Sequence, residues 1–263
     1  MEVHHHPKLN HEKKAWKEYL LEGLMIFVAV TMGFFAETIR ENISESGKGN
    51  ELAKSLYQEV YADSITMHQK IEMRMLKEAQ MEYFRRYVTD SSLTHLSEKF
   101  YPAFVWSFIV ITTNSFEPND GMLNLLRNSG SLRYFKSVEL QNRVSNITVA
   151  ISKLRERNSQ ELRFVEEYTR PFMLRHYDFK WQDEYTHNGK LSIIEALAQT
   201  NFHAKAAPFI KHPEDFNKED AEGLAAYYLL ITRASRQIFY QPYIEANHQL
   251  LQQLRKEYNF KDE

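Results

Sequence analysis

The chain has 263 residues, 43% of them hydrophobic, which is enough to bury one sizeable core or two small ones. A formal net charge of −2 gives no global attraction to nucleic acid or acidic lipid, and the lack of cysteine excludes disulfides, thiolate zinc sites and a cysteine nucleophile. Only 8 glycines and 7 prolines accompany 13% aromatic residues, a balance that favours long helices over many short strands. We therefore expect an all-α fold.

The first predicted segment, residues 1–18, contains three adjacent histidines. His4, His5 and His6 offer neutral imidazoles, which bind borderline metal ions, so they are candidate metal ligands. Adjacent side chains converge poorly on one ion, because metal sites normally draw on spaced ligands. The alternatives are a short tag, or an oligomer in which each subunit supplies one ring. We expect no other cofactor.

Residues 19–40 are predicted to form a transmembrane helix. The centre of this segment carries no charge, and about 21 helical residues span about 31 Å, which matches the core of a bilayer. Trp16 and Tyr19 precede the apolar run and Phe34 and Phe35 close it, as interfacial aromatic belts would. A buried core helix and a cleaved signal peptide are the alternatives. They are disfavoured because almost every side is apolar and no small-x-small cleavage pattern follows.

Basic residues indicate the orientation of this helix. Lys13, Lys14 and Lys17 lie close before the apolar run, whereas the bases after it, beginning with Arg40, are more spread out. Because positive charge concentrates on the cytoplasmic side, the amino terminus is predicted to be cytoplasmic and the bulk of the chain to lie outside.

One face of the predicted span combines small and charged residues. At about 100° per residue, Glu22, Ala29, Gly33, Ala36 and Arg40 fall near one line. Ala29 and Gly33 form a small-xxx-small pair, which lets two helices approach closely in lipid. We interpret this stripe as a helix-association face and expect a homo-oligomer. The alternative is a chance arrangement of residues that are common in spans.

Two acids frame the apolar run, and their neighbours differ. Glu37 has Arg40 at helical spacing, whereas Glu22 has another acid, Glu18, one turn back. In a ring of helices, Glu22 and Glu37 would form two acidic collars, as in cation pores, and are therefore a possible ion pathway. The alternative places both acids at the membrane boundary, in contact with water, lipid headgroups or a base.

Beyond the span, residues 41–50 are predicted to be a linker, because SESGKGN is polar and contains two glycines. Residues 51–263 are predicted to be a helical domain. Its first helix, 51 to about 87, is amphipathic and resembles a coiled-coil helix, so a long-helix bundle is expected. Its apolar stripe comprises Leu52, Leu56, Val60, Met67, Ile71, Met75 and Tyr83. The second apolar run, 100–116, is predicted to be a buried helix, with a strand or a second span as alternatives.

Capping residues delimit the following helices. Asn119 or Asp120 is expected to cap a short helix that stops at Gly130, and Ser137 to cap a long helix ending before Pro171. The apolar residues of that long helix are Val144, Ile147, Ile151, Leu154, Leu162 and Val165.

An aromatic loop, residues 176–190, precedes a short helix, 191–200, and a final helix, 218–258, interrupted or kinked at Pro242. The loop gathers five possible metal ligands, from which a hydrolytic site could be drawn: His176, Asp178, Asp183, Glu184 and His187. Interleaved aromatic residues favour instead a loop that packs its rings inward. No HExxH, GxSxG or phosphate-binding glycine loop occurs, so we expect no enzyme.

Two stretches, YLLEGLMIFVAVTMGFFAETIREN and SFEPNDGMLNLLRNSGSLRYFKSVELQNRVSNI, resemble uncharacterised single-span inner-membrane proteins of Bacteroidota. In that group a span with an acid at its entrance precedes a coiled-coil-like helix, an aromatic-x-Pro-x-Asn/Asp turn, here 116–120, and a Ser-Gly-x-Leu-Arg sequence, here 129–133. The resemblance covers about half of the chain. It implies an inner-membrane protein with a helical periplasmic domain, and it implies no catalytic residues.

The leading hypothesis is a non-enzymatic bitopic membrane protein, a self-associating scaffold or a binding module for other membrane or periplasmic proteins. One alternative is a subunit of an ion-conducting or proton-coupled complex that uses Glu22 and Glu37. Another is a membrane-anchored metal sensor or enzyme. Nucleic acid is excluded as a partner, because no basic helix-turn-helix is present.

Overall fold

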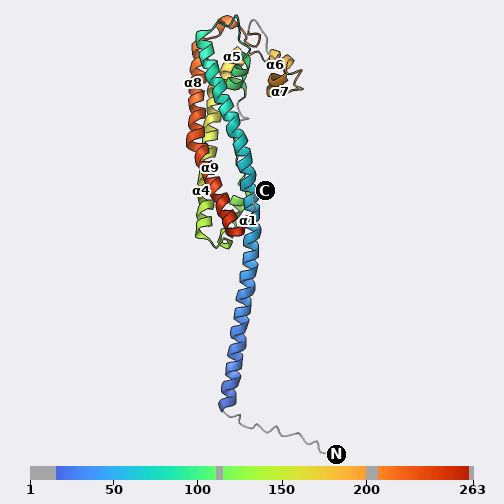
Figure 1. Cartoon of the computed structure of the whole chain (residues 1–263), viewed down its shortest axis with the longest axis vertical. Helices are drawn as coiled ribbons and strands as arrows, with labels where there is room; N and C mark the ends of the chain where they lie inside the picture. The colour runs from blue at the N-terminus through green and yellow to red at the C-terminus, as the bar shows by residue number, and fades with distance from the viewer. Residues whose placement is uncertain (1–15, 111–114, 200–206, 261–263) are drawn as a thin grey trace, which may run out of the picture. The chain divides into compact units, whose positions relative to one another are not determined.

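The computed structural model describes residues 16–110, 115–199 and 207–260 (Figure 1). Every regular element in these ranges is a helix, and a single antiparallel bridge pairs Tyr177 with Ile210. The all-α prediction is thus confirmed for the described chain. Contacts divide the protein into two compact units, Met1–Leu52 and Ala53–Glu263, hereafter unit 1 and unit 2.

The first helix, α1 (Trp16–Asp90), is continuous. The interruption expected within residues 41–50 is not observed, because SESGKGN is helical throughout. Each glycine costs about 1 kcal/mol relative to alanine, but extending a helix that already exists on both sides is far easier than starting one. The boundary between the units, after Leu52, nevertheless falls close to the end of the predicted linker.

By length and composition, α1 is able to cross a bilayer, and it is the one helix of the described chain that meets this criterion. None of its apolar window is buried within the protein, which argues against a core helix. A signal sequence near the amino terminus would satisfy the same criterion. The shorter apolar helix at Phe100–Ile109 is too short to span.

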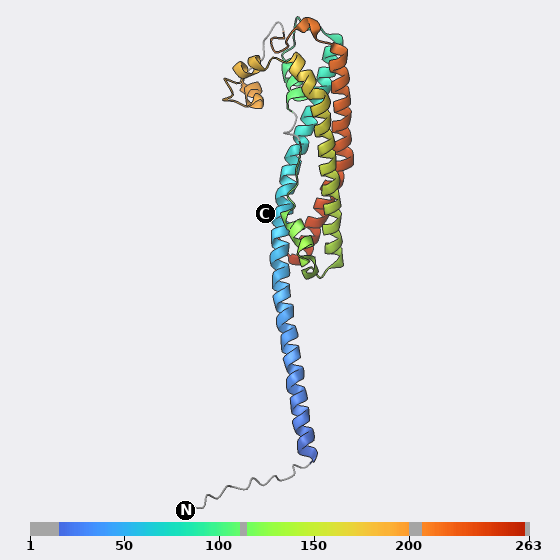
Figure 2. The same cartoon turned by 180° about the vertical axis from the view of Figure 1, so that it is seen from behind.

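Long helices run lengthwise through unit 2. They are the second part of α1, α4 (Val138–Phe164), α8 (Lys218–Ser235) and α9 (Gln241–Tyr258). In Figures 1 and 2, α8 and α9 form one nearly continuous rod beside α4. This packing buries much of the predicted apolar stripe of α4, but Leu162 is 47% exposed.

Prolines mark π-helical turns in both long rods and do not end them. The turn η3 (Val165–Thr169) joins α4 to α5 (Arg170–His176), which holds Pro171, and η5 (Arg236–Tyr240) joins α8 to α9, which holds Pro242. A proline lacks an N–H donor and crowds the carbonyl one turn earlier. The wider π turn accommodates both effects, so the end predicted before Pro171 was wrong and the helix continues.

The buried helix predicted for 100–116 is present in its first part only, as α2 (Phe100–Phe104) and the π turn η1 (Val105–Ile109). Residues 110, 115 and 116 are not helical, and 111–114 lie outside the described residues. Next, α3 (Gly121–Asn128) stops two residues before Gly130, whose φ of 68° is the left-handed geometry expected there. Ser137 caps α4 as predicted, since its side chain accepts a hydrogen bond from the Leu140 N–H.

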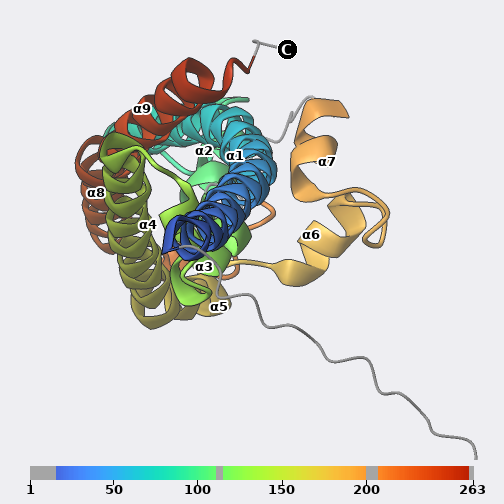
Figure 3. The ribbon, with the colours of Figure 1, turned by 90° about the horizontal axis from the view of Figure 1, so that it is seen from below.

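Aromatic side chains dominate the core at one end of unit 2. Phe84 of α1 meets Phe108 edge to face, with 5.0 Å between ring centroids, and stacks on Phe100 at 5.6 Å. Two short helices, α6 (Phe179–Tyr185) and α7 (Ile193–Gln199), pack beside this core, on the side away from α8 (Figure 3). The predicted aromatic loop therefore contains a helix.

Candidate interaction groove

The residues predicted for the span lie on α1 and are exposed. They are Glu22, Ala29, Gly33, Ala36, Glu37 and Arg40. The ion pair expected from helical spacing is confirmed, since Arg40 donates to Glu37 at 2.5 Å. Association through this face and conduction through its acids stay predictions. The histidines at positions 4 to 6 lie outside the described residues.

The possible metal ligands of the aromatic segment do not converge. His176 is buried at the end of α5, Asp178 accepts two backbone N–H bonds to cap α6, and Asp183, Glu184 and His187 are exposed. Within the described chain, the one group of three that could hold an ion is His212, Glu214 and Asp215. All three are exposed at a single 3-10 turn, where their chemistry is that of a solvated surface.

Two cations of α1 lie in the core of unit 2. Arg74 donates to the Tyr240 hydroxyl at 2.9 Å and pairs with Glu161 of α4. Lys77 Nζ donates to the Val110 carbonyl at 2.9 Å and to the Tyr228 hydroxyl at 3.0 Å. Burial lowers the pKa of Lys77 to about 7, and Glu161 offsets only part of this effect. Through these bonds the two cations hold α1 against the neighbouring helices of unit 2.

Residues of three helices hold the aromatic-x-Pro-x-Asn/Asp turn in place. Asp63 of α1 accepts hydrogen bonds from the Asn119 N–H at 3.0 Å and from the Tyr243 hydroxyl at 3.1 Å. Arg155 of α4 pairs with Asp120 at 2.5 Å and with Glu117. Arg155 lowers the pKa of Asp120, whereas burial raises that of Asp63. This motif is therefore a structural joint between α1, α4 and α9.

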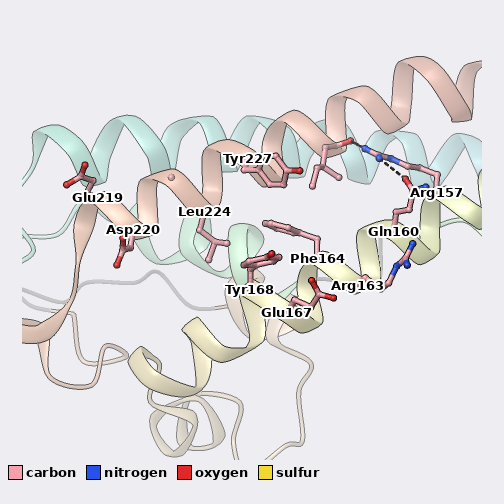
Figure 4. Close-up of a pocket in the computed structure, with 12 residues that line it drawn as sticks. Arg157, Gln160, Arg163, Phe164, Glu167, Tyr168, Glu219, Asp220, Leu224 and Tyr227 are labelled. Atoms are coloured by element: carbon pink, nitrogen blue, oxygen red, sulfur yellow. Dashed lines mark hydrogen bonds between the residues drawn. The ribbon is translucent and has the colours of Figure 1, made fainter.

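A groove of about 750 Å³ opens between α4–η3 and α8, entirely within unit 2 (Figure 4). Because the two helices run in opposite directions, residues early in α8 face residues late in η3. Arg157, Gln160 and Arg163 lie at one end of the groove, and Glu219 and Asp220 lie at the other. The groove thus has one basic and one acidic end, and a further acid, Glu167, lies between them.

Aromatic rings form the middle of the groove. Phe164 lies between Tyr168 and Tyr227, with centroid distances of 5.4 and 5.2 Å. Tyr168 and Tyr227 are 57% and 55% exposed, although each carries a large aromatic ring that burial would stabilise. Exposed aromatic rings rimmed by charges are typical of protein-binding surfaces.

One helical wall of the groove includes a glycine. Gly223 of α8 lines the groove, and a Cβ built there would have no other atom within 4 Å, leaving aside its chain neighbours and the backbone of its own helix. A methyl group at this position would therefore meet no neighbouring atom. The basic end is held firmly, since Arg157 donates to the Ile231 carbonyl at 3.0 Å and to Gln160 at 3.1 Å.

None of these groove residues was singled out from the sequence. Two signals were available, the aromatic residues Phe164 and Tyr168 four positions apart, and the adjacent Tyr227 and Tyr228. Tyr228 is buried and Tyr227 is exposed, as expected for neighbouring positions on an amphipathic helix.

Fold and site together define an all-α protein with one candidate span and an open groove lined by aromatic and charged side chains. Comparison of the chain with protein-family models, with curated proteins and with solved structures gives no match.

Proposed function

We propose that this protein is a non-enzymatic, bitopic protein of a bacterial inner membrane, whose helical periplasmic domain binds a protein partner in the groove between α4–η3 and α8. The observation that carries the proposal is the line of exposed rings between a basic and an acidic end. A partner segment gains apolar burial from Tyr168 and Tyr227 and is oriented by the opposed charges, because complementary charge fixes register and partner choice.

Anchoring is supported by α1, whose exposed apolar stretch needs an apolar environment. In lipid, the stripe through Ala29 and Gly33 would bring copies of α1 together, so that one assembly would carry several grooves. Linked grooves raise the overall affinity without new contacts. The alternative, an ion pathway through Glu22 and Glu37, requires Glu37 to leave its pair with Arg40.

Site-directed photo-crosslinking in the source cells tests the groove. Benzoylphenylalanine replaces Tyr227, and, as a matched control on the same rod, the exposed Ile238. We expect a discrete heterologous adduct from position 227 only. A second change, Gly223→Phe, fills the groove and should remove that adduct, whereas Gly223→Ala should keep it. Equal adducts from both positions, or an adduct that survives Gly223→Phe, contradict the proposal.

The cysteine-free sequence allows a direct test of topology. Single cysteines at Asn10 and at the exposed Ser152 of α4 are treated with a membrane-impermeant maleimide on spheroplasts. We expect labelling at position 152 and none at position 10 until the membrane is lysed. The reverse pattern would place the groove in the cytoplasm.

A further inference from the structure

A second hollow lies in unit 2, separate from the groove. It is a cavity of about 280 Å³ between α1 and α9. Its apolar wall comes from both helices, namely the buried Met67 and Leu251 and the partly buried Ile71 and Ile244. A mostly apolar hollow with a few polar groups is the usual form of a small-molecule site.

One buried amide lines this cavity. Asn247 of α9 is only 3% exposed, and its Nδ2 donates to the Val60 carbonyl of α1 at 2.9 Å. Because a carbonyl oxygen accepts only from a donor, this bond fixes which end of the amide is the nitrogen. The other end, Oδ1, accepts no hydrogen bond within the described chain, yet it is not sealed in the core. Asn247 therefore leaves one acceptor open to the cavity.

The ionisable groups of the lining are already engaged with neighbours. Arg255 donates to the Tyr57 hydroxyl at 3.2 Å and lies over the ring of that tyrosine. His68 lies 3.4 Å from Glu72, and His248 lies 3.2 Å from a glutamine of its own helix. No described lining residue is a carboxylate. Apolar contact and the Asn247 oxygen thus recognise the ligand, which favours a neutral molecule, because burying a charge without a counter-charge is costly.

We propose that this cavity binds a small neutral molecule with an apolar body and one N–H or O–H donor, with the body between α1 and α9 and the donor on Asn247 Oδ1. The ring of Tyr243 and the thioether of Met67 favour an aromatic body. The volume is at the lower end of the range of small-molecule sites, about 300 Å³, so the ligand is smaller than a peptide. The proposal does not depend on the groove or on its partner.

Calorimetry on the full-length protein in lipid nanodiscs tests this inference. The probe is indole, and the matched probe is benzofuran, which has the same shape but an ether oxygen in place of the N–H donor. Heats from empty nanodiscs are subtracted. We expect saturable binding of indole at one site and binding of benzofuran that is about tenfold weaker or more, because the Asn247 oxygen then loses its donor. No saturable heat from indole, or equal affinity for the two probes, overturns the proposal.

Substitutions then locate the site. Asn247→Leu removes the acceptor and keeps a side chain of similar shape, so it should weaken indole binding about tenfold without weakening benzofuran binding. The control is Asn146→Leu, at an exposed asparagine of α4 outside the cavity, and it should change neither affinity. Indole binding that is unchanged by Asn247→Leu places the ligand elsewhere and refutes the assignment. If Asn247→Leu prevents folding, the two probes on the unmodified protein still decide the question.

Discussion

The buried ammonium of Lys77 should make stability rise with pH above neutrality. In the unfolded chain Lys77 keeps its ordinary pKa of 10.5, but burial lowers its pKa to about 7 in the folded protein. Between these values the unfolded state binds more protons than the folded state, so the free energy of unfolding increases as pH rises. Below pH 7 both states are protonated and the full cost of burying the charge is present.

The two pKa values set the size of this effect. From pH 7 to pH 9, the linkage relation gives an increase of about 2 kcal/mol from Lys77 alone. Few other groups interfere in this range. Burial raises the pKa of Tyr228 and Tyr240, so these phenols act at higher pH, whereas burial lowers the pKa of His176, which acts at lower pH.

Urea unfolding of the full-length protein in non-ionic detergent measures this slope, with tryptophan fluorescence, to which the buried Trp106 contributes, as the signal. Lys77→Met is the comparison, because it keeps an unbranched side chain of similar length and removes the titrating group. The variant leaves the Val110 carbonyl without its lysine donor, so its absolute stability does not test the prediction. The change of its stability with pH does test it. A pH dependence that is equal in the two proteins would refute the assignment of a lowered pKa to Lys77.

Three further predictions concern other parts of the chain. Gly33→Leu should shift the native mass in detergent toward monomer, because it fills the close-approach position of the association face, and an unchanged mass would count against that face. Asp63→Ala should lower the free energy of unfolding by about 2 to 3 kcal/mol, since the Asn119 and Tyr243 donors lose a buried acceptor; urea unfolding checks this. Gly223→Ala should raise it by about 0.5 to 1 kcal/mol, because alanine is the better helix former and meets no clash.

The stripe of α1 shows how far periodicity predicts a core. Leu56, Val60 and Met67 are buried as predicted, but Met75, placed in the same stripe, is 53% exposed. In its stead Arg74 and Lys77 face the core. Hydrophobic patterning treats a charge as a marker of the surface, so it assigned the face wrongly where the charges are bonded to tyrosine, glutamate and a carbonyl.

The groove could not be predicted for a related reason. Tyr168 lies on the π turn η3, where the residues no longer follow a 100° step, so a helical wheel extended from α4 misplaces it. Pro171 then ended the predicted helix, although α5 continues it. Local capping signals did better at Ser137 and Gly130, because these residues act through bonds and torsions within a few residues and need no knowledge of distant partners. Asp120 precedes α3 as predicted, but its side chain makes no capping hydrogen bond.

Buried charges give α1 a register that apolar packing alone would not enforce. Asp63 bonds to α9 and to the turn at residues 116–120. Arg74 bonds to α4 and to η5 in the α8–α9 rod. Lys77 bonds to α8 and to the Val110 carbonyl at the end of η1. A slip of α1 by one residue would turn each side chain by about 100° and leave its charge buried without its partner. Breaking a buried ion pair such as Arg74–Glu161 costs about 3 to 5 kcal/mol, whereas an apolar stripe repacks for less. We infer that these charges hold α1 against sliding and rotation within unit 2.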